Sequence, residues 1–172
     1  MHPFYTSRSA IECYQHCPRK RWLGYLYGGR GLAATRANVP LTTGTCIHTG
    51  VAFLLRNVMQ GLIMDVSQSG IENWVDSAVS IALQEYQKVV SESGIQVKQH
   101  EDSAFVYAQE CAKTEALVRA WAIAELPILV KEYEIYSVED EIVVPLSVNV
   151  LLQARVDAIL KSRRAGEFII IH

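Results

Sequence analysis

The sequence predicts one domain of the α/β (α+β) class over residues 1–172, in which N-terminal helices pack on a small β-meander. Half of the 172 residues are hydrophobic and a fifth are charged, a composition that supports one sizeable core. Apolar positions recur at helical spacing up to about residue 126 and alternate as in strands after it. No repeat or low-complexity linker interrupts this order, so the helices are expected to cover an antiparallel sheet.

The first helix is expected near the N-terminus. Thr6, Ser7 or Ser9 can cap it, because a short hydroxyl side chain accepts a hydrogen bond from an amide of the first turn. Apolar positions beginning at Ile11 then recur at helical spacing. Residues 28–40 contain three glycines and a proline, which predicts a loop.

Three longer helices follow this loop in the prediction. Thr42 or Thr43 can cap the first of them, and Ser69 begins the second. The third covers residues 102–126 and ends or kinks at Pro127, which cannot donate a backbone hydrogen bond.

Three strands in succession complete the predicted fold. Residues 133–145, 148–160 and 167–172 alternate or are continuously apolar, and short turns separate them. Residues 168–171 are apolar on both faces, so we expect this last strand to be covered on both sides.

The middle strand carries polar residues on one face only. Its even positions are all apolar and form the expected buried face: Leu152, Ala154, Val156, Ala158 and Leu160. Its odd positions include Gln153, Arg155 and Asp157. This polar face is either an ordinary solvent face or a functional one, and a doubly covered neighbouring strand would favour the functional interpretation.

Strand pairing sharpens the functional interpretation. If residues 161–166 form the loop, Asp157 pairs with Ile170 and Arg155 pairs with His172. Asp157 and His172 are then diagonal neighbours on one face, about 7–8 Å apart, and together could hold a divalent cation. A loop one residue longer or shorter would reverse the face.

The charge of the chain is unevenly distributed. Its net charge is −2, but residues 1–56 hold seven Lys or Arg and one acid, whereas residues 57–145 hold five bases and fifteen acids. Such a separation is typical of a surface that binds a polyanion, although solvated carboxylates on exposed helices explain it equally well.

A basic cluster and its aromatic neighbours stand out in the N-terminal part. Arg19, Lys20 and Arg21 precede Trp22 and Tyr25, and together they could grip phosphates and stack on bases. A basic helix end beside core aromatics is the alternative.

The cysteines and the N-terminus indicate an intracellular, cytoplasmic protein without a membrane partner. No apolar run reaches the roughly 18 residues of a membrane helix, and the N-terminus lacks a signal-peptide core. Cys13, His16 and Cys17 make a weak zinc pattern because no second ligand pair follows. Cys46 and Cys111 are expected in the core.

His48 lies in the stretch TTGTCIHTG, on the first turns of a predicted helix and beside its apolar positions. A single histidine there is either a structural residue or a ligand.

Taken in order, these stretches resemble the RecB-like nucleases of the PD-(D/E)xK superfamily, a branch that includes CRISPR-associated exonucleases. SRSAIECYQHCPRKRWLGYL resembles their N-terminal Tyr-x-x-Cys-Pro-Arg signature. TTGTCIHTG resembles their Gly and metal-ligating His, which correspond to Gly44 and His48. LLQARVDAIL resembles their Gly-Arg-(Ile/Val)-Asp-x-(Ile/Leu) strand, and GEFIIIH resembles the strand after it.

The resemblance implies metal-assisted hydrolysis of DNA with Mg²⁺ or Mn²⁺. It makes Asp157 and His172 the expected catalytic residues and His48, Asp157 and His172 the expected metal ligands. Arg155 joins the basic cluster as an expected nucleic-acid contact. An iron–sulfur cluster is not expected, since only Cys17 matches its cysteine pattern. A helicase or recombination protein is an expected partner, in DNA repair, recombination or phage DNA processing.

The sequence departs from the family pattern at its end. His172 stands where the second metal carboxylate is expected, and the expected catalytic lysine would follow it. We therefore expect a restriction-endonuclease-like core that lacks its last helix and strand, and little activity from residues 1–172. Two alternatives are a non-catalytic DNA-binding module and a partner-docking module on the same scaffold.

Overall fold

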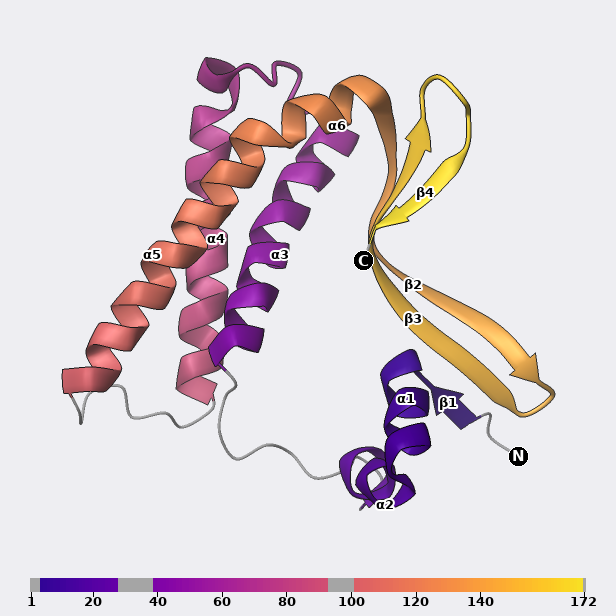
Figure 1. The fold of residues 1–172 in the computed structure, drawn as a ribbon. Helices are drawn as coiled ribbons and strands as arrows, with labels where there is room; N and C mark the ends of the chain where they lie inside the picture. The colour runs from indigo at the N-terminus through magenta and orange to yellow at the C-terminus, as the bar shows by residue number, and fades with distance from the viewer. Residues whose placement is uncertain (1–3, 28–38, 93–100, 172) are drawn as a thin grey trace. The chain divides into compact units, whose positions relative to one another are not determined.

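The computed structural model describes residues 4–27, 39–92 and 101–171 and has a mixed α/β fold, as predicted (Figure 1). In chain order its elements are β1 (Phe4–Thr6), α1 (Arg8–His16), α2 (Pro18–Arg21), η1 (Trp22–Leu26), α3 (Val39–Met59), α4 (Gln68–Glu92), α5 (Glu101–Ala124), α6 (Leu126–Glu132), β2 (Tyr133–Ser147), β3 (Val150–Ser162) and β4 (Phe168–Ile171). They form two compact units. Of the described residues, the N-terminal unit comprises 4–27 and 139–156, and the helical unit comprises 39–92, 101–138 and 157–171.

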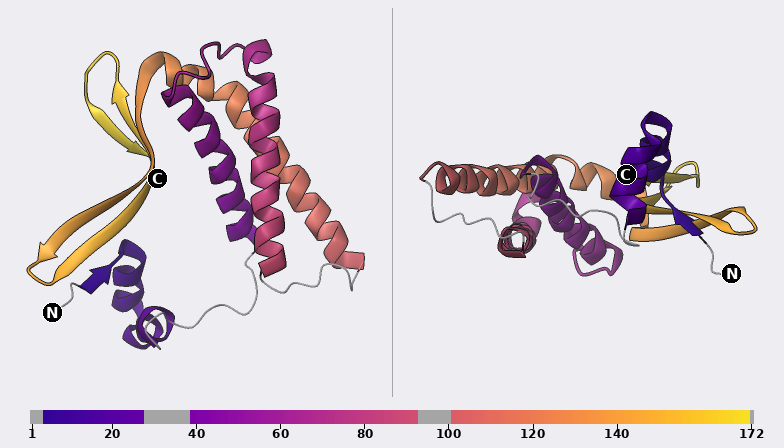
Figure 2. Two further views of the ribbon diagram at one scale, coloured as in Figure 1. Left: turned by 180° about the vertical axis from the view of Figure 1, so that it is seen from behind. Right: turned by 90° about the horizontal axis from the view of Figure 1, so that it is seen from below.

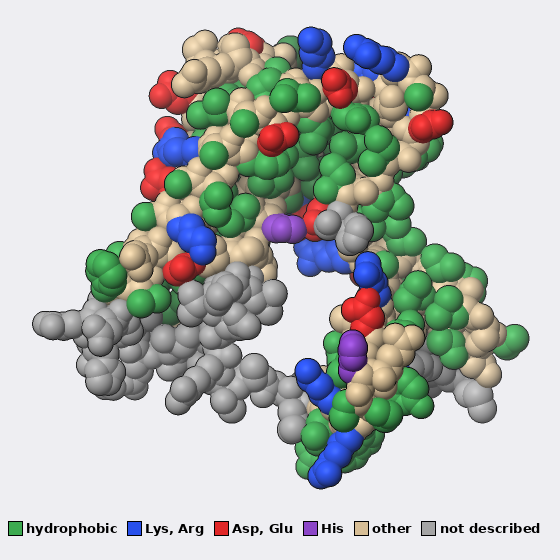
Figure 3. All heavy atoms as spheres, in the orientation of Figure 1, with side chains coloured by type: hydrophobic (Ala, Val, Ile, Leu, Met, Phe, Trp, Pro, Cys, Tyr) green, Lys and Arg blue, Asp and Glu red, His purple; other side chains and the backbone are tan. Residues whose placement is uncertain are grey.

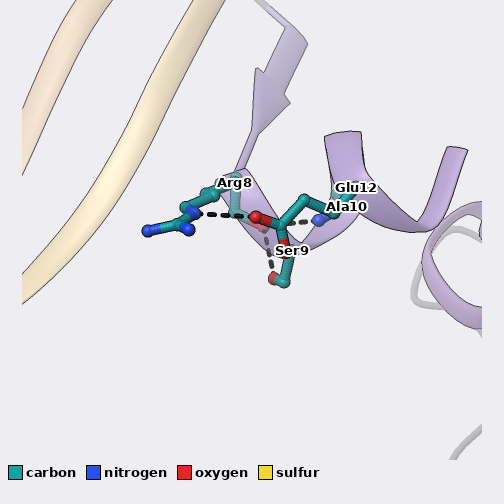
Figure 4. A network of polar contacts seen from close by, with 5 residues as sticks. Arg8, Ser9, Ala10 and Glu12 are labelled. Atoms are coloured by element: carbon teal, nitrogen blue, oxygen red, sulfur yellow. Dashed lines mark hydrogen bonds and ion pairs between the residues drawn. The ribbon is translucent and has the colours of Figure 1, made fainter. Parts of the chain in front are cut away.

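Helix α1 begins at a capping serine. Ser7 has extended backbone angles, and its Oγ accepts a hydrogen bond from the amide of Ala10 at 3.3 Å. Arg8 Nε donates to Glu12 Oε1 at 2.7 Å one turn later, and the Ser9 hydroxyl lies 3.1 Å from that of Ser7 (Figure 4). Of the three predicted caps, Ser7 is therefore the correct one.

The sheet has the order β1-β3-β2, and β4 also pairs with β3. Strand β1 runs parallel to β3, with Thr6 opposite Leu152. The predicted antiparallel meander is therefore a mixed sheet. A three-residue strand is too short for its alternation to be recognised in the sequence. It is a strand because it pairs with β3, about 146 positions away in the chain.

Helices α3, α4 and α5 form the body of the helical unit, and each contacts the other two (Figures 1 and 2). Leu54 of α3, Ile71 of α4 and Val118 of α5 are almost completely buried in one cluster. Apolar residues on three helices thus remove one another from water, which is the main stabilising contribution to this unit.

The same core reaches the sheet. Ile135 of β2 and both Ala158 and Leu160 of β3 are buried in the cluster that contains the helix residues. The predicted buried face of β3 is thereby confirmed for its C-terminal half, where the helices cover it.

The boundaries of two helices differ from prediction. α3 begins at Val39, three residues before Thr42, so Thr43 lies inside the helix and donates its hydroxyl to Glu110 Oε2 at 2.5 Å instead of capping. The long helix α5 ends at Ala124, and Pro127 lies in the first turn of the separate helix α6, where its missing amide costs nothing.

The turn before β4 is shorter than predicted. Ser162 and Glu167 are joined by a backbone hydrogen bond of 2.8 Å, and Gly166 between them has a φ of +71°. Ile170 is paired with Ile159 and not with Asp157. The register prediction was wrong by two residues, which preserves the face of every side chain because the strand period is two.

Strand β4 is not covered on both sides as expected. Its four residues are 39–57% exposed, and hydrophobic side chains are visible at the surface over this part of the sheet (Figure 3). Continuous apolarity indicated burial, but the described neighbours of this strand, which include the ring of Tyr136 on β2 against Phe168, leave its side chains exposed.

Candidate metal centre

His48 of α3 and Asp157 of β3 meet although 109 positions separate them. His48 Nδ1 lies 3.2 Å from Asp157 Oδ1, and both residues belong to the helical unit. Two residues that the family resemblance implies as metal ligands are thus in contact, while their role as ligands stays a prediction. Their side chains are 56% and 37% exposed, so the pair is open to solvent and to a ligand.

The packing of α3 and β3 explains the meeting. On α3, Ala52 and Leu55 lie one and two turns after His48 and are buried, which places the histidine at the margin of the buried stripe. On β3, Ala158 points into the same core, and its neighbour Asp157 therefore points to the opposite face.

The donor atoms fit a small hard cation. Two neighbouring ligands of an octahedral Mg²⁺ or Mn²⁺ with bonds of roughly 2.1 Å stand about 3 Å apart, close to the distance between Nδ1 and Oδ1. The same geometry also allows His48 Nδ1–H to donate to Asp157 directly, which leaves Nε2 as a ligand atom. In both arrangements one imidazole nitrogen and one carboxylate can serve a metal.

The described residues supply no third ligand beside this pair. Within residues 4–27, 39–92 and 101–171, no group of three or more His, Cys, Asp or Glu side chains is placed to hold a metal ion. Cys13, His16 and Cys17 lie among these described residues and are not grouped in this way. His172 lies outside the described residues.

The comparison with protein families decides the identity of this fold. The model of the PD-(D/E)XK nuclease superfamily matches residues 5–172. The chain belongs to the PD-(D/E)XK nuclease superfamily. Its members are generally nucleases that use divalent metals, usually Mg²⁺ or Mn²⁺. A search of curated proteins found no match.

Two carboxylates of this PD-(D/E)XK chain, Glu139 and Glu141, form contacts that the sequence did not predict. Arg155 donates to Glu139 at 2.7 Å, and Gln153 donates to Glu141. The sequence pattern that could have predicted these pairs is simple. Two acids stand two positions apart on β2, and two polar residues stand two positions apart on β3 opposite them. Arg155 remains 69% exposed, and its contact with nucleic acid stays a prediction.

The basic cluster belongs to the N-terminal unit of the nuclease fold. Arg19 and Lys20 on α2 are exposed, whereas Arg21 is half-buried and lies over the ring of Tyr14, with 5.6 Å between the guanidinium carbon and the ring centre. Binding of DNA by this cluster stays a prediction. No helix in the described part of the chain combines the length and apolarity of a membrane span.

The cysteines within the helices have structural positions. Cys46 is fully buried, and burial, with a smaller effect of the Glu85 carboxylate, raises the pKa of its thiol to about 11. Burial also raises the pKa of Cys111, which is half-buried. Both thiols are free and protonated at neutral pH, so neither is a ready nucleophile or metal ligand.

Proposed function

We propose that this chain is a metal-dependent DNA nuclease of the RecB-like type, which hydrolyses phosphodiester bonds with Mg²⁺ or Mn²⁺. The observation that carries the proposal is the 3.2 Å contact between His48 and Asp157. The superfamily match over residues 5–172 supports the reaction class, and the order of the motifs supports the RecB-like type.

His48 and Asp157 would hold the cation, with His172 as a further ligand. The metal, when bound, supplies polarisation of the scissile phosphate and a lowered pKa for its water. Asp157 contributes the negative charge that a hard cation requires, and His48 contributes a neutral donor held by α3. The exposure of both side chains leaves room for a phosphate and a water molecule.

The biological setting is also part of the proposal. A RecB-like nuclease acts on DNA in repair, recombination or phage DNA processing, beside a helicase or recombination protein. We further propose that residues 1–172 cleave slowly by themselves. Among the described residues Asp157 pairs with His48 and forms no ion pair with a lysine or arginine. Such a cation beside Asp157 would offset charge at the phosphate.

Metal titration tests the proposed site without requiring turnover. Binding of Mn²⁺ to the native chain is compared with binding to Asp157→Asn and His48→Ala, by calorimetry or by the electron paramagnetic resonance of free Mn²⁺. We expect each substitution to weaken binding at least roughly tenfold, because outer-shell changes alone cost about that much.

Matched variants control for charge and residue type. Asp76→Asn removes a carboxylate that pairs with Arg119, and His16→Ala removes an exposed imidazole at the end of α1. Both should bind Mn²⁺ like the native chain. Equal Mn²⁺ affinity in all five proteins would refute the metal site.

A further inference from the structure

A small hollow lies within the N-terminal unit, and its lining residues do not include those used above for the metal. Its volume is about 170 Å³, and it is lined by parts of β1, α1, α2, η1 and β3. Drug-sized ligands occupy pockets of roughly 300–1,000 Å³, so this hollow suits one nucleobase, with an attached group lying at its rim, better than a larger molecule.

One wall of the hollow contains an unsatisfied hydroxyl. Thr6 is 8% exposed, and its Oγ1 is buried without a hydrogen-bond partner among the described residues. Its backbone is held in β1 opposite Leu152, so the side chain cannot simply turn out into solvent with the strand intact. Leaving a buried hydroxyl unpaired is costly, and a ligand group that reached it would offset this cost.

We propose that this hollow binds one nucleotide, with its base against the aromatic rings and its phosphate near Arg21. Tyr5 and Tyr25 line the hollow and are 52% and 39% exposed, so ring surface is available for stacking. Arg21 lines it as well and supplies a guanidinium, the side chain that pairs best with phosphate.

The remaining polar groups suit the edge of a base. Gln153 lines the hollow and donates its amide NH₂ to Glu141, which leaves its carbonyl oxygen as an acceptor. The hydroxyl of Thr6 can donate or accept. Because the bases of a duplex are stacked and paired, only an unpaired nucleotide presents both a ring face and a free edge to these groups.

This inference rests on the proposed function because it takes DNA as the substrate, and it adds that the hollow binds an unpaired nucleotide of that DNA. A nucleotide of a single strand and a free nucleotide present the same chemical groups to the hollow. Binding of dTMP, dAMP and deoxyribose 5-phosphate to the 172-residue chain is measured by calorimetry with a chelator present. We expect both nucleotides to bind and the sugar phosphate to bind at least roughly tenfold more weakly, since base stacking is lost.

Two substitutions test the walls of the hollow. Tyr25→Ala should weaken nucleotide binding roughly tenfold, whereas the control Tyr27→Ala should not, because Tyr27 packs on Trp22. Thr6→Val should weaken binding roughly three- to tenfold. It should also raise the melting temperature of the ligand-free chain, because it removes an unpaired hydroxyl. A purely structural Thr6 would not weaken binding.

Equal affinity for nucleotides and sugar phosphate, or unchanged binding in both Tyr25→Ala and Thr6→Val, would overturn the inference. Displacement of dTMP by a short dT oligonucleotide identifies a strand as the source, and absence of displacement identifies a free nucleotide. The measurement is repeated on Asp157→Asn. Nucleotide binding that survives while Mn²⁺ affinity is unchanged by this substitution would remove the metal site and leave the inference standing.

Discussion

At the scale of single residues, the contact between His48 and Asp157 is a solvated one. Both side chains are more than a third exposed, and exposed pairs of this kind contribute about 0–1 kcal/mol to stability. The pair therefore contributes little to the stability of the fold, and its side chains are available for ligand binding.

We therefore expect Asp157→Asn and His48→Ala to leave the free energy of unfolding within about 1 kcal/mol of the native value. Urea denaturation followed by circular dichroism measures it. A loss of several kcal/mol would mean that the pair is a structural contact and that weakened metal binding in these variants has an indirect cause.

The buried thiol of Cys46 predicts a pH dependence. The pKa is about 11 in the folded chain and 9.0 for an unperturbed thiol, so the folded chain holds a proton that the unfolded chain loses between these values. The associated stability is fully present below pH 9 and is lost as pH rises toward 11, by roughly 2–3 kcal/mol.

Urea unfolding under reducing conditions at pH 7.5, 9 and 10.5 measures this loss. Cys46→Ala is the control, because other groups that ionise at high pH are common to both proteins. The stability of the native chain relative to Cys46→Ala should fall with rising pH. If the difference in stability between the two proteins were the same at all three pH values, the pKa of Cys46 would not be raised in the folded chain.

At the scale of elements, the close approach of α3 to α4 and α5 depends on one glycine. A Cβ on Gly50 would lie 3.1 Å from the carbonyl oxygen of Ala78, 3.2 Å from Val118 Cγ2 and 3.3 Å from Ala82 Cβ. These neighbours are backbone or short side chains on two helices, so they cannot move aside independently.

Gly50→Ala should therefore destabilise the chain by about 1–2 kcal/mol through overpacking. The matched variant is Gly44→Ala on the same helix, where a Cβ would meet nothing within 4 Å. That substitution should stabilise the chain by about 0.5–1 kcal/mol, as expected for alanine in a helix. Thermal unfolding compares the two, and equal shifts would refute the packing argument.

At the scale of the whole chain, positive charge is concentrated in the N-terminal residues and negative charge in the helices that follow. The seven bases of residues 1–56 include Arg19 and Lys20, both exposed on α2. A polyanion would gain by releasing counterions at such a surface, which makes the strength of binding depend on salt.

The double variant Arg19→Ala/Lys20→Ala should weaken DNA binding and flatten its salt dependence by roughly 0.7–0.9 slope units per lost phosphate contact. The control Lys88→Ala/Lys113→Ala removes the same charge from residues paired with glutamates on α4 and α5. Fluorescence anisotropy from low to high salt measures both. Equal slopes in the two variants would make the cluster a solvated helix end.

Cleavage is the second property of the whole chain. We expect residues 1–172 to cut labelled single- and double-stranded DNA slowly or not at all with Mn²⁺, because two described donors hold a hard cation weakly. Rapid cleavage that disappears in Asp157→Asn would contradict this expectation and would still support the metal site. Binding of DNA without any cleavage would favour the non-catalytic alternative.

The sequence by itself determined the class of the fold, the long helices and the succession of strands, and the family resemblance singled out His48 and Asp157. Hydrophobic periodicity and a hydroxyl cap before α1 are local properties, although only the structure selected Ser7 among three candidates, and the motif order pointed to residues that meet. The sequence could not determine strand β1, the register of β4 or the hollow around Thr6. These features depend on contacts between segments far apart in the chain, where pairing and packing outweigh local preference.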